Sequence, residues 1–142
     1  MNNKRVHFGT IFYLCCSLSI LGFAPGAVAK EQLTADEIRA LLPSNTLSGR
    51  TQEQRQVIVY HNPDGTMEGM SRGQGIHYDS GTWKVTDEGQ YCRKWQRWRA
   101  KDEDCFLVYR IDDDSYQLKA VGDVYNGRAR ILPGDPNGLK RN

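Results

Sequence analysis

The sequence is poor in the residues that usually build metal centres and redox sites. It holds 4 cysteines and 3 histidines in 142 residues, and Cys15 and Cys16 lie in an N-terminal apolar run. His61 and His77 have no close metal-ligand spacing to each other or to the other two cysteines. No Cys-x-x-Cys pair occurs. The pattern gives no support for zinc or a catalytic dithiol, so we expect no metal.

Catalytic motifs are missing as well. No glycine-rich phosphate loop precedes a helix, and no serine lies in a nucleophile elbow. Asp112-Asp113-Asp114 resembles a set of paired carboxylates, but no calcium-loop spacing follows it. We interpret these three carboxylates as a solvated turn. We therefore expect that the protein is not an enzyme and uses no cofactor.

The N-terminus has the three parts of an export signal. A basic Lys4-Arg5 pair precedes the apolar run over 8–23, and an Ala-Val-Ala cleavage site ends at Ala29. One alternative is a membrane anchor, for which the run is short because a span needs about 20 residues. Another is lipidation at Cys16, which lacks the usual small residue before it. We expect residues 1–29 to be a signal peptide and the mature protein, without a membrane span, to be periplasmic or secreted.

The mature chain carries no excess of either charge. The whole sequence has 19 basic and 17 acidic residues, and removing Lys4 and Arg5 leaves the two kinds equal in number. This balance gives no basis for a nucleic-acid partner. The mature length is that of one domain, without a repeat or a second domain. We expect a monomer.

A single helical pattern comes first, and strand patterns follow it. Thr34 and Glu37 have the spacing of a capping box, and Pro43 ends a predicted helix over 34–42. Predicted strands then cover residues 56–60, 66–70, 76–85, 90–96, 104–111, 116–120 and 125–131. Because tight turns join them, we predict an all-β domain over 30–132, a small antiparallel up-and-down barrel of about eight strands with a short N-terminal helix. A two-sheet sandwich is the alternative, and 133–142 is predicted to be a flexible tail.

Cys92 and Cys105 are the two cysteines outside the predicted signal peptide. If the hairpin between them is centred between Trp98 and Arg99, they face each other across antiparallel strands. That separation is within reach of a disulfide. We predict a Cys92–Cys105 bond that contributes on the order of 3 kcal/mol to stability.

The predicted tip of that hairpin is rich in cations and tryptophan. Such a combination can bind anionic surfaces with its charges and insert or stack its rings. The alternative is that Asp102, Glu103 and Asp104 neutralise the run, which leaves a solvated surface. The candidate surface residues are Arg93, Lys94, Arg97, Trp98 and Arg99.

Gly81-Thr82-Trp83 suits the closed end of a small barrel, where an inward ring plugs the end and the backbone passes close. Trp83 is then either a core aromatic or part of a ligand site. The candidate ligand-binding residues of the barrel interior are Trp83, Tyr109, Tyr116, Leu118 and Tyr125.

A resemblance to a known family rests on four features of the sequence: the Gly-x-Trp strand, Cys92, Cys105 and the opening residues 33–38 and 45–49. The chain resembles a family of short exported proteobacterial proteins of unknown function with a lipocalin-like, calycin-type barrel. The resemblance covers about residues 31–132 and implies a calycin-type barrel and a periplasmic location. More distantly, the chain is similar to bacterial inhibitors of secreted metalloproteases, in which an N-terminal segment blocks the protease cleft. The comparable segment here is predicted to be helical.

Two functions are consistent with these features. The first is a non-enzymatic binding barrel that holds a small apolar or amphipathic ligand in its interior. The second is a protein–protein interaction module or hydrolase inhibitor that acts through the hairpin tip or the N-terminal helix. A pocket large enough for a ligand favours the first function, and an interior filled by the protein's own side chains favours the second.

Overall fold

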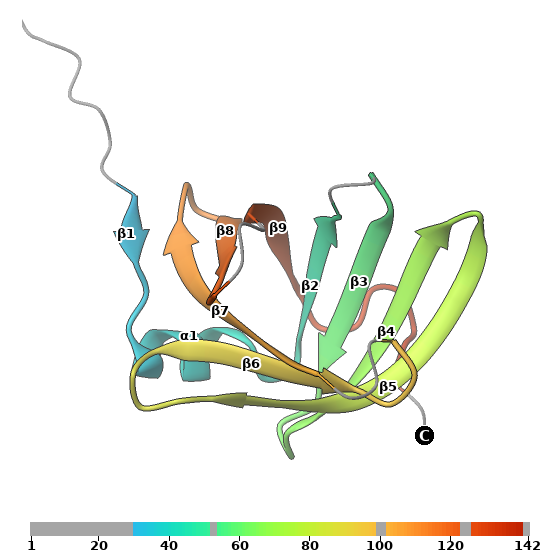
Figure 1. The fold of residues 1–142 in the computed structure, drawn as a ribbon, viewed down its shortest axis with the longest axis horizontal. Helices are drawn as coiled ribbons and strands as arrows, with labels where there is room; N and C mark the ends of the chain where they lie inside the picture. The colour runs from blue at the N-terminus through green and yellow to red at the C-terminus, as the bar shows by residue number, and fades with distance from the viewer. Residues whose placement is uncertain (1–29, 52–53, 99–101, 123–125, 141–142) are drawn as a thin grey trace, which may run out of the picture.

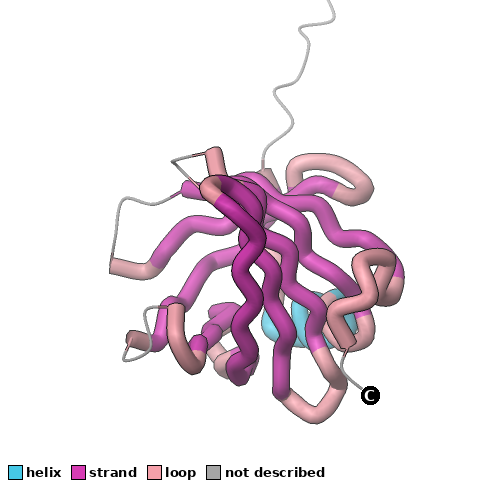
Figure 2. Tube along the Cα trace, turned by 90° about the vertical axis from the view of Figure 1, so that its right-hand side faces the viewer, coloured by secondary structure: helices cyan, strands magenta, loops and turns pink. Residues whose placement is uncertain are grey.

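The protein forms a closed antiparallel barrel of eight strands (Figures 1 and 2). The computed structural model describes residues 30–51, 54–98, 102–122 and 126–140. The barrel strands are β2 (Asn45–Arg50), β3 (Gln56–His61), β4 (Thr66–Gly73), β5 (Gly75–Val85), β6 (Gln90–Trp95), β7 (Glu103–Arg110), β8 (Ser115–Ala120) and β9 (Asn126–Pro133). Each strand pairs with the next, and β9 pairs with β2 to close the ring. The predicted up-and-down barrel is confirmed.

A short N-terminal strand and one helix complete the fold. β1 (Glu31–Gln32) pairs with the end of β7, where Glu31 lies opposite Arg110. α1 (Ala35–Leu41) follows and closes one end of the barrel (Figure 1). Its Ile38 and the following Leu42 are buried in the same cluster as the strand side chains. The helix therefore serves as part of the core.

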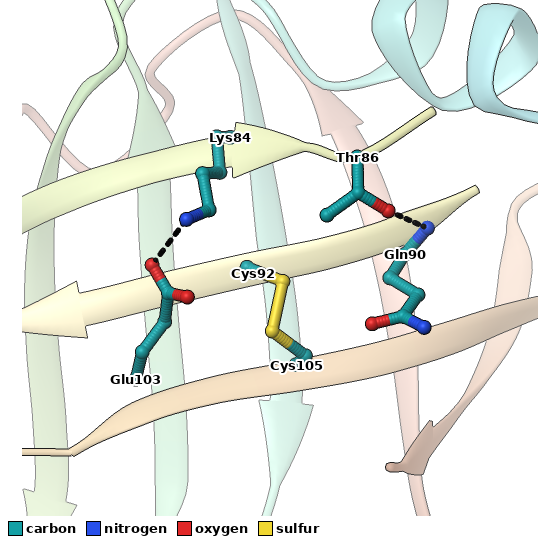
Figure 3. Close-up of a disulfide and its surroundings, with 6 residues drawn as sticks. All are labelled: Lys84, Thr86, Gln90, Cys92, Glu103 and Cys105. Atoms are coloured by element: carbon teal, nitrogen blue, oxygen red, sulfur yellow. Dashed lines mark hydrogen bonds and ion pairs between the residues drawn. A yellow bond between two sulfur atoms is a disulfide. The ribbon is translucent and has the colours of Figure 1, made fainter. Parts of the chain in front are cut away.

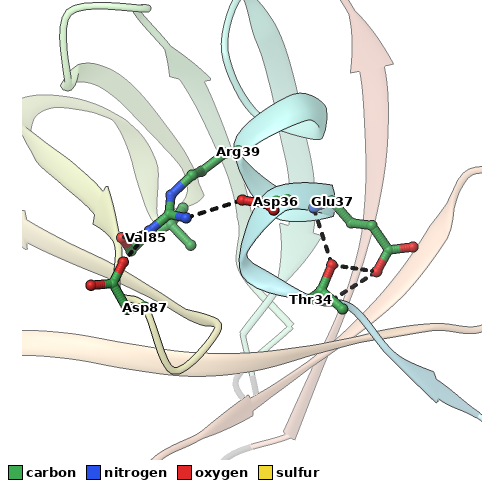
Figure 4. Close-up of polar contacts among 6 residues, drawn as sticks. All are labelled: Thr34, Asp36, Glu37, Arg39, Val85 and Asp87. Carbon is green, nitrogen blue, oxygen red and sulfur yellow. Dashed lines mark hydrogen bonds and ion pairs between the residues drawn. The ribbon is translucent and has the colours of Figure 1, made fainter.

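α1 begins at the predicted capping box (Figure 4). The Glu37 amide donates to Thr34 Oγ1 at 3.3 Å, and the Thr34 amide donates to Glu37 Oε2 at 2.8 Å. Arg39 ties the helix to the β5–β6 turn by donating to the carbonyl of Val85 at 3.3 Å and to Asp87 Oδ1 at 2.8 Å. These bonds hold the helix across the end of the barrel. In the described residues, no helix is long and apolar enough to cross a membrane.

Inward side chains fill the barrel as the period-two pattern requires. One buried cluster lies near α1, and its strand members are Leu47, Tyr91, Phe106, Val108, Tyr116, Leu118 and Ala129. A second cluster contains Val59, Met67 and Trp95. Trp83 packs against both clusters. The interior described by these strands is a packed core.

A third apolar cluster lies on the outside of β3 and β4. It contains Ile58, Tyr60, Met70 and, from the C-terminal segment, Leu139. The Leu139 amide donates to Asp135 Oδ1 at 2.8 Å, which fixes the turn that brings Leu139 back. Residues 134–140, expected as a flexible tail, thus lie against the barrel and cover apolar positions of the outer face.

Candidate functional site

The predicted disulfide is present and closes the β6–β7 hairpin (Figure 3). Cys92 and Cys105 are direct partners in the ladder, with their Cα atoms 4.0 Å apart. Beside them, Lys84 Nζ and Glu103 Oε1 form an ion pair at 2.8 Å. The two cysteines and Glu103 are the one cluster of possible metal ligands found among the described residues. Because the sulfurs are bonded to each other, they are not free thiolates for a metal.

A buried carboxylate shapes the tip of this hairpin. Asp79, on β5, is fully buried and accepts hydrogen bonds from the amides of Trp98 at 2.7 Å, Arg97 at 2.9 Å and Ser80 at 2.9 Å. Burial opposes ionisation, but the hydrogen bonds from Trp98, Arg97 and Ser80 outweigh it and lower the pKa of Asp79. The ionised side chain therefore holds the chain after β6 back against β5.

Because of this bend, the Trp98 ring folds over the end of the barrel. It lies 4.8 Å from the Trp95 ring, centroid to centroid, and is half-buried. Gly69 leaves room for both rings, since a Cβ there would lie 2.4 Å from the Trp95 ring. Trp98 was predicted to be an exposed surface residue, and the structure corrects this prediction. Lys94 and Arg97 are exposed, and Arg99 lies outside the described residues.

Arg93, predicted on the surface, points into the barrel. The reason is the strand period: Cys92 and Lys94 face outward, so Tyr91, Arg93 and Trp95 face inward. The Arg93 guanidinium carbon lies 4.8 Å from the centre of the Phe106 ring. Its Nε is buried and has no hydrogen-bond partner among the described residues. The assignment of Arg93 to a surface site is wrong for this reason.

The structure places three of the five predicted interior residues on inward positions. Tyr116 and Leu118 are buried in the core, and Trp83 packs beside them while its Nε1 donates to the carbonyl of Asn62 at 3.0 Å. Tyr109 is a correction: it alternates with the inward Val108 and lies on the outer face, next to Lys30. Tyr125 lies outside the described residues.

A buried contact between His61 and Tyr91 in the core was not predicted from the sequence. His61 Nε2 lies 2.8 Å from the Tyr91 hydroxyl, and its Nδ1 lies 3.4 Å from the carbonyl of Asn45. Burial lowers the pKa of His61 to about 4, and the charge of Arg93 adds to this, against the opposing hydrogen bond to Asn45. The imidazole is therefore neutral at pH 7, with Nδ1 donating to Asn45 and Nε2 accepting from Tyr91. The alternation of inward and outward residues along β3 places His61 in the core, and this pattern is the sequence signal that could have identified it.

A small cavity lies between the packed side chains. It has a volume of about 40 Å³ and is lined in part by Leu47, Val57, Arg93 and Leu118. Sites for drug-sized molecules are larger, about 300–1,000 Å³. This cavity has room for a few waters or one small group. It shares Gly49, Arg128 and Ala129 with a larger, open pocket of about 630 Å³, which lies at the barrel rim and is also lined by Ile111 and Ser115. The volume of that pocket is within the range of small-ligand sites.

The first half of β5 has a paired strand on one side only in the described part of the fold. The predicted strands over 66–70 and 76–85 left residues 71–75 unpaired between them, but β4 and β5 stay paired up to Gly73 and Gly75. β6 pairs only with residues 81–85 of β5. The first half of β5 therefore extends past the end of β6 (Figure 1). We call residues 75–79 the open β5 edge.

Hydrogen-bond directions show which groups face this edge. Successive residues of a strand point their backbone groups to opposite neighbours. The Trp83 amide donates to Gly65 on the β4 side, whereas the Ser80 carbonyl accepts from Gln96 on the β6 side. The backbone N–H and C=O groups of even-numbered residues of β5 therefore point to the side on which β6 lies. The amides of Ile76 and Tyr78 therefore point to that side, beyond the end of β6, and have no partner in the described part of the chain.

Two large side chains accompany these amides. Ile76 is 57% and Tyr78 50% exposed, on the outward face of the same strand. Their neighbours across the ladder are Arg72 and Met70. Arg97 Nη2 donates to the Tyr78 carbonyl at 2.7 Å and so caps one acceptor of the edge. Exposed apolar side chains beside unpaired backbone donors are typical of a strand that accepts another strand.

Comparison with models of known protein families gave no match, and no curated protein matches the chain.

Proposed function

We propose that this protein is a non-enzymatic exported barrel that recognises a protein partner by strand addition at the open β5 edge. The observation that carries the proposal is the pair of outward amides at Ile76 and Tyr78 beside their exposed side chains. Strand addition uses backbone hydrogen bonds for affinity and alternate side chains for specificity. The edge supplies both.

The chemistry of the edge describes the partner segment. An extended segment would accept hydrogen bonds from the amides of Ile76 and Tyr78 with its own carbonyls. Because Ile76 and Tyr78 lie two residues apart on one face, the segment would place apolar side chains at alternate positions on that face. Arg72, across the ladder from Ile76, would favour an acidic residue at the end of this apolar pair. The partner is therefore an extended, apolar and weakly acidic stretch of another protein.

The two surfaces first expected to make contacts are less suited to this task. The apolar face of α1 is buried in the barrel, where Ile38 has no exposed surface. The hairpin tip is bent back by Asp79, and the Trp98 ring covers Trp95. These side chains are engaged within the fold, whereas Ile76 and Tyr78 are not.

The test is photo-crosslinking in cells that export the full chain. A photoreactive phenylalanine analogue replaces Tyr78 in one variant and Thr82 in a matched control. Thr82 is exposed on the same face of β5, but there β6 covers the edge, opposite Lys94. We expect one discrete adduct of higher mass from position 78, and none from position 82.

Three results would count against the proposal. Equal adducts at both positions would show contact without use of the edge. An adduct with the mass of two copies of this chain would show self-association in place of a partner. No adduct at position 78, with the variant exported and folded, would mean that the edge is unoccupied in the cell.

A further inference from the structure

An ion pair lies at the point where the pairing of β5 with β6 ends. In the described part of the chain, the last backbone bond between them runs from the Gln96 amide to the Ser80 carbonyl, at 2.9 Å. Side chains bind the next two backbone groups on this side of β5. Asp79 Oδ1 accepts from the Ser80 amide at 2.9 Å, and Arg97 Nη2 donates to the Tyr78 carbonyl at 2.7 Å. The Asp79–Arg97 pair therefore caps β5 just before the open β5 edge.

The Asp79 carboxylate also fixes the position of Arg97. Its Oδ1 lies 3.4 Å from Arg97 Nε, and its Oδ2 accepts from the Arg97 amide at 2.9 Å. Asp79 is fully buried, whereas the Arg97 side chain is 71% exposed. The guanidinium is thus held in place by a buried anion and is still accessible to a ligand from the solvent. Its planar set of N–H groups suits a carboxylate.

Beyond this cap, β5 presents a short row of three backbone groups. In order away from Arg97, they are the Tyr78 amide, the Ile76 carbonyl and the Ile76 amide, and none has a backbone partner in the described part of the chain. In a parallel segment, one residue would donate to the Ile76 carbonyl and accept from the Tyr78 amide, and the residue two positions earlier would accept from the Ile76 amide. A parallel segment can therefore satisfy all three groups.

The capped Tyr78 carbonyl distinguishes between the two directions. In an antiparallel segment, the residue opposite Tyr78 would also donate to this carbonyl, and it would have to share the acceptor with the cationic Arg97. A parallel segment needs the carbonyl only for the amide that follows its residue opposite Tyr78. If the chain ends at that residue, this amide does not exist, and the terminal carboxylate comes to lie beside the Arg97 guanidinium.

We propose that the segment added at the open β5 edge is the C-terminus of the partner protein, parallel to β5, with its terminal carboxylate bound by Arg97. This inference rests on the proposed function and adds the direction and the end of the bound segment. The last residue and the residue two positions before it would place apolar side chains beside Tyr78 and Ile76. Arg97 is the positioning residue that selects a chain end over an internal stretch.

The experiment maps the crosslink of the exported full chain that carries the photoreactive phenylalanine analogue in place of Tyr78. The adduct is digested, and mass spectrometry identifies the partner residues joined to position 78. We expect them within about the last four residues of the partner chain. With the partner identified, a Gly-Ser-Gly-Ser extension at its C-terminus should lower the adduct yield at least tenfold. The same extension at its mature N-terminus should leave the yield unchanged.

Arg97→Gln tests the positioning residue. In this variant Asp79 can still accept from the backbone amides at positions 97 and 98, so we expect the hairpin tip to keep its fold. The adduct yield should fall at least fivefold. Lys94→Gln removes an exposed charge from the outer face of β6 and should leave the yield unchanged.

The outcomes separate this inference from the proposed function. The absence of any adduct at position 78 contradicts both. An adduct on an internal or N-terminal stretch of the partner agrees with strand addition but overturns the C-terminal assignment, as does an unchanged yield with the C-terminal extension or in Arg97→Gln. An equal loss in Lys94→Gln would show a general effect of charge and would overturn the role of Arg97. If Arg97→Gln does not fold, the mapped crosslink and the two extensions decide.

Discussion

At the residue scale, buried polar groups determine where the chain bends and what it can hold. Asp79 fixes the direction of the hairpin tip through the amides of Arg97 and Trp98. His61 joins β3 to β6 through the Tyr91 hydroxyl. Each group is satisfied in one protonation state only. The folded state should therefore respond to pH through a small number of identifiable residues.

His61 should make the protein less stable in mild acid. Its folded pKa of about 4 lies below the ordinary value of 6.5, because burial disfavours the cation. As pH falls below 6.5, the unfolded chain binds a proton that the folded chain does not, so stability is complete above this pH and is lost on acidification. Between pH 7 and pH 4 we expect a loss of about 3 kcal/mol from this residue.

Urea unfolding at pH 7, 6, 5 and 4.5 measures this dependence. His61→Gln should show a flatter curve than the wild type over this range. His77→Gln is the control, because it removes an exposed histidine of β5 and keeps the buried contact between His61 and Tyr91. Parallel curves for the wild type and His61→Gln would show that His61 is not buried as a neutral ring.

At the element scale, the β6–β7 hairpin depends on its disulfide. The bond spans 13 positions in sequence and joins neighbouring strands of the barrel. Replacing both cysteines by alanine should lower the free energy of unfolding by about 3 kcal/mol, since the unfolded chain gains the freedom of an open loop. Urea unfolding under oxidising conditions measures the difference.

The adjacent ion pair provides the comparison. Lys84 is largely exposed, so Lys84→Ala should cost less than about 1 kcal/mol. If the double alanine variant were as stable as Lys84→Ala, the disulfide would not be what secures this hairpin.

The elements that sequence predicted well are those with clear local signals. The capping box at Thr34 and Glu37 marked α1, and the spacing of Cys92 and Cys105 gave the correct ladder register. β2 was not predicted as a strand, because its short sequence Asn45–Arg50 mixes polar residues with Gly49 and lacks alternation. Its pairing depends on β9, where a Cβ at Gly49 would lie 3.0 Å from the carbonyl of Arg128. A contact between strands so far apart in the chain leaves no pattern within the β2 sequence itself from which the strand could be predicted.

The candidate sites were less predictable for the same reason. Arg93 was grouped with its charged neighbours in sequence, although the strand period points it inward. Tyr109 was taken as inward, although it follows Val108 directly. The open β5 edge arises because β6 is shorter than β5, which no composition or motif shows. Relative strand lengths around a closed barrel are properties of the whole fold.

At the scale of the whole molecule, a barrel normally removes its strand edges. Here the ring is closed, but the first half of β5 extends beyond β6 and keeps an edge. The core is filled by the protein's own side chains, and α1 and the C-terminal segment cover further apolar surface. Among the described residues, three large apolar side chains are exposed: Ile76 and Tyr78 on β5, and Val121 in the turn after β8. Ile76 and Tyr78 lie together beside unpaired backbone amides, which is why we place recognition there.

The most direct measurement is residue-resolved amide hydrogen exchange on the purified mature protein. If the β5 edge is open, the amides of Ile76 and Tyr78 should exchange rapidly, while those of His77 and Asp79, which face β4, should be protected at least a hundredfold more. A fast-slow alternation along 76–79 is the result that this account predicts. Equal protection of all four amides would show that the edge is already covered, and it would contradict recognition by strand addition at β5.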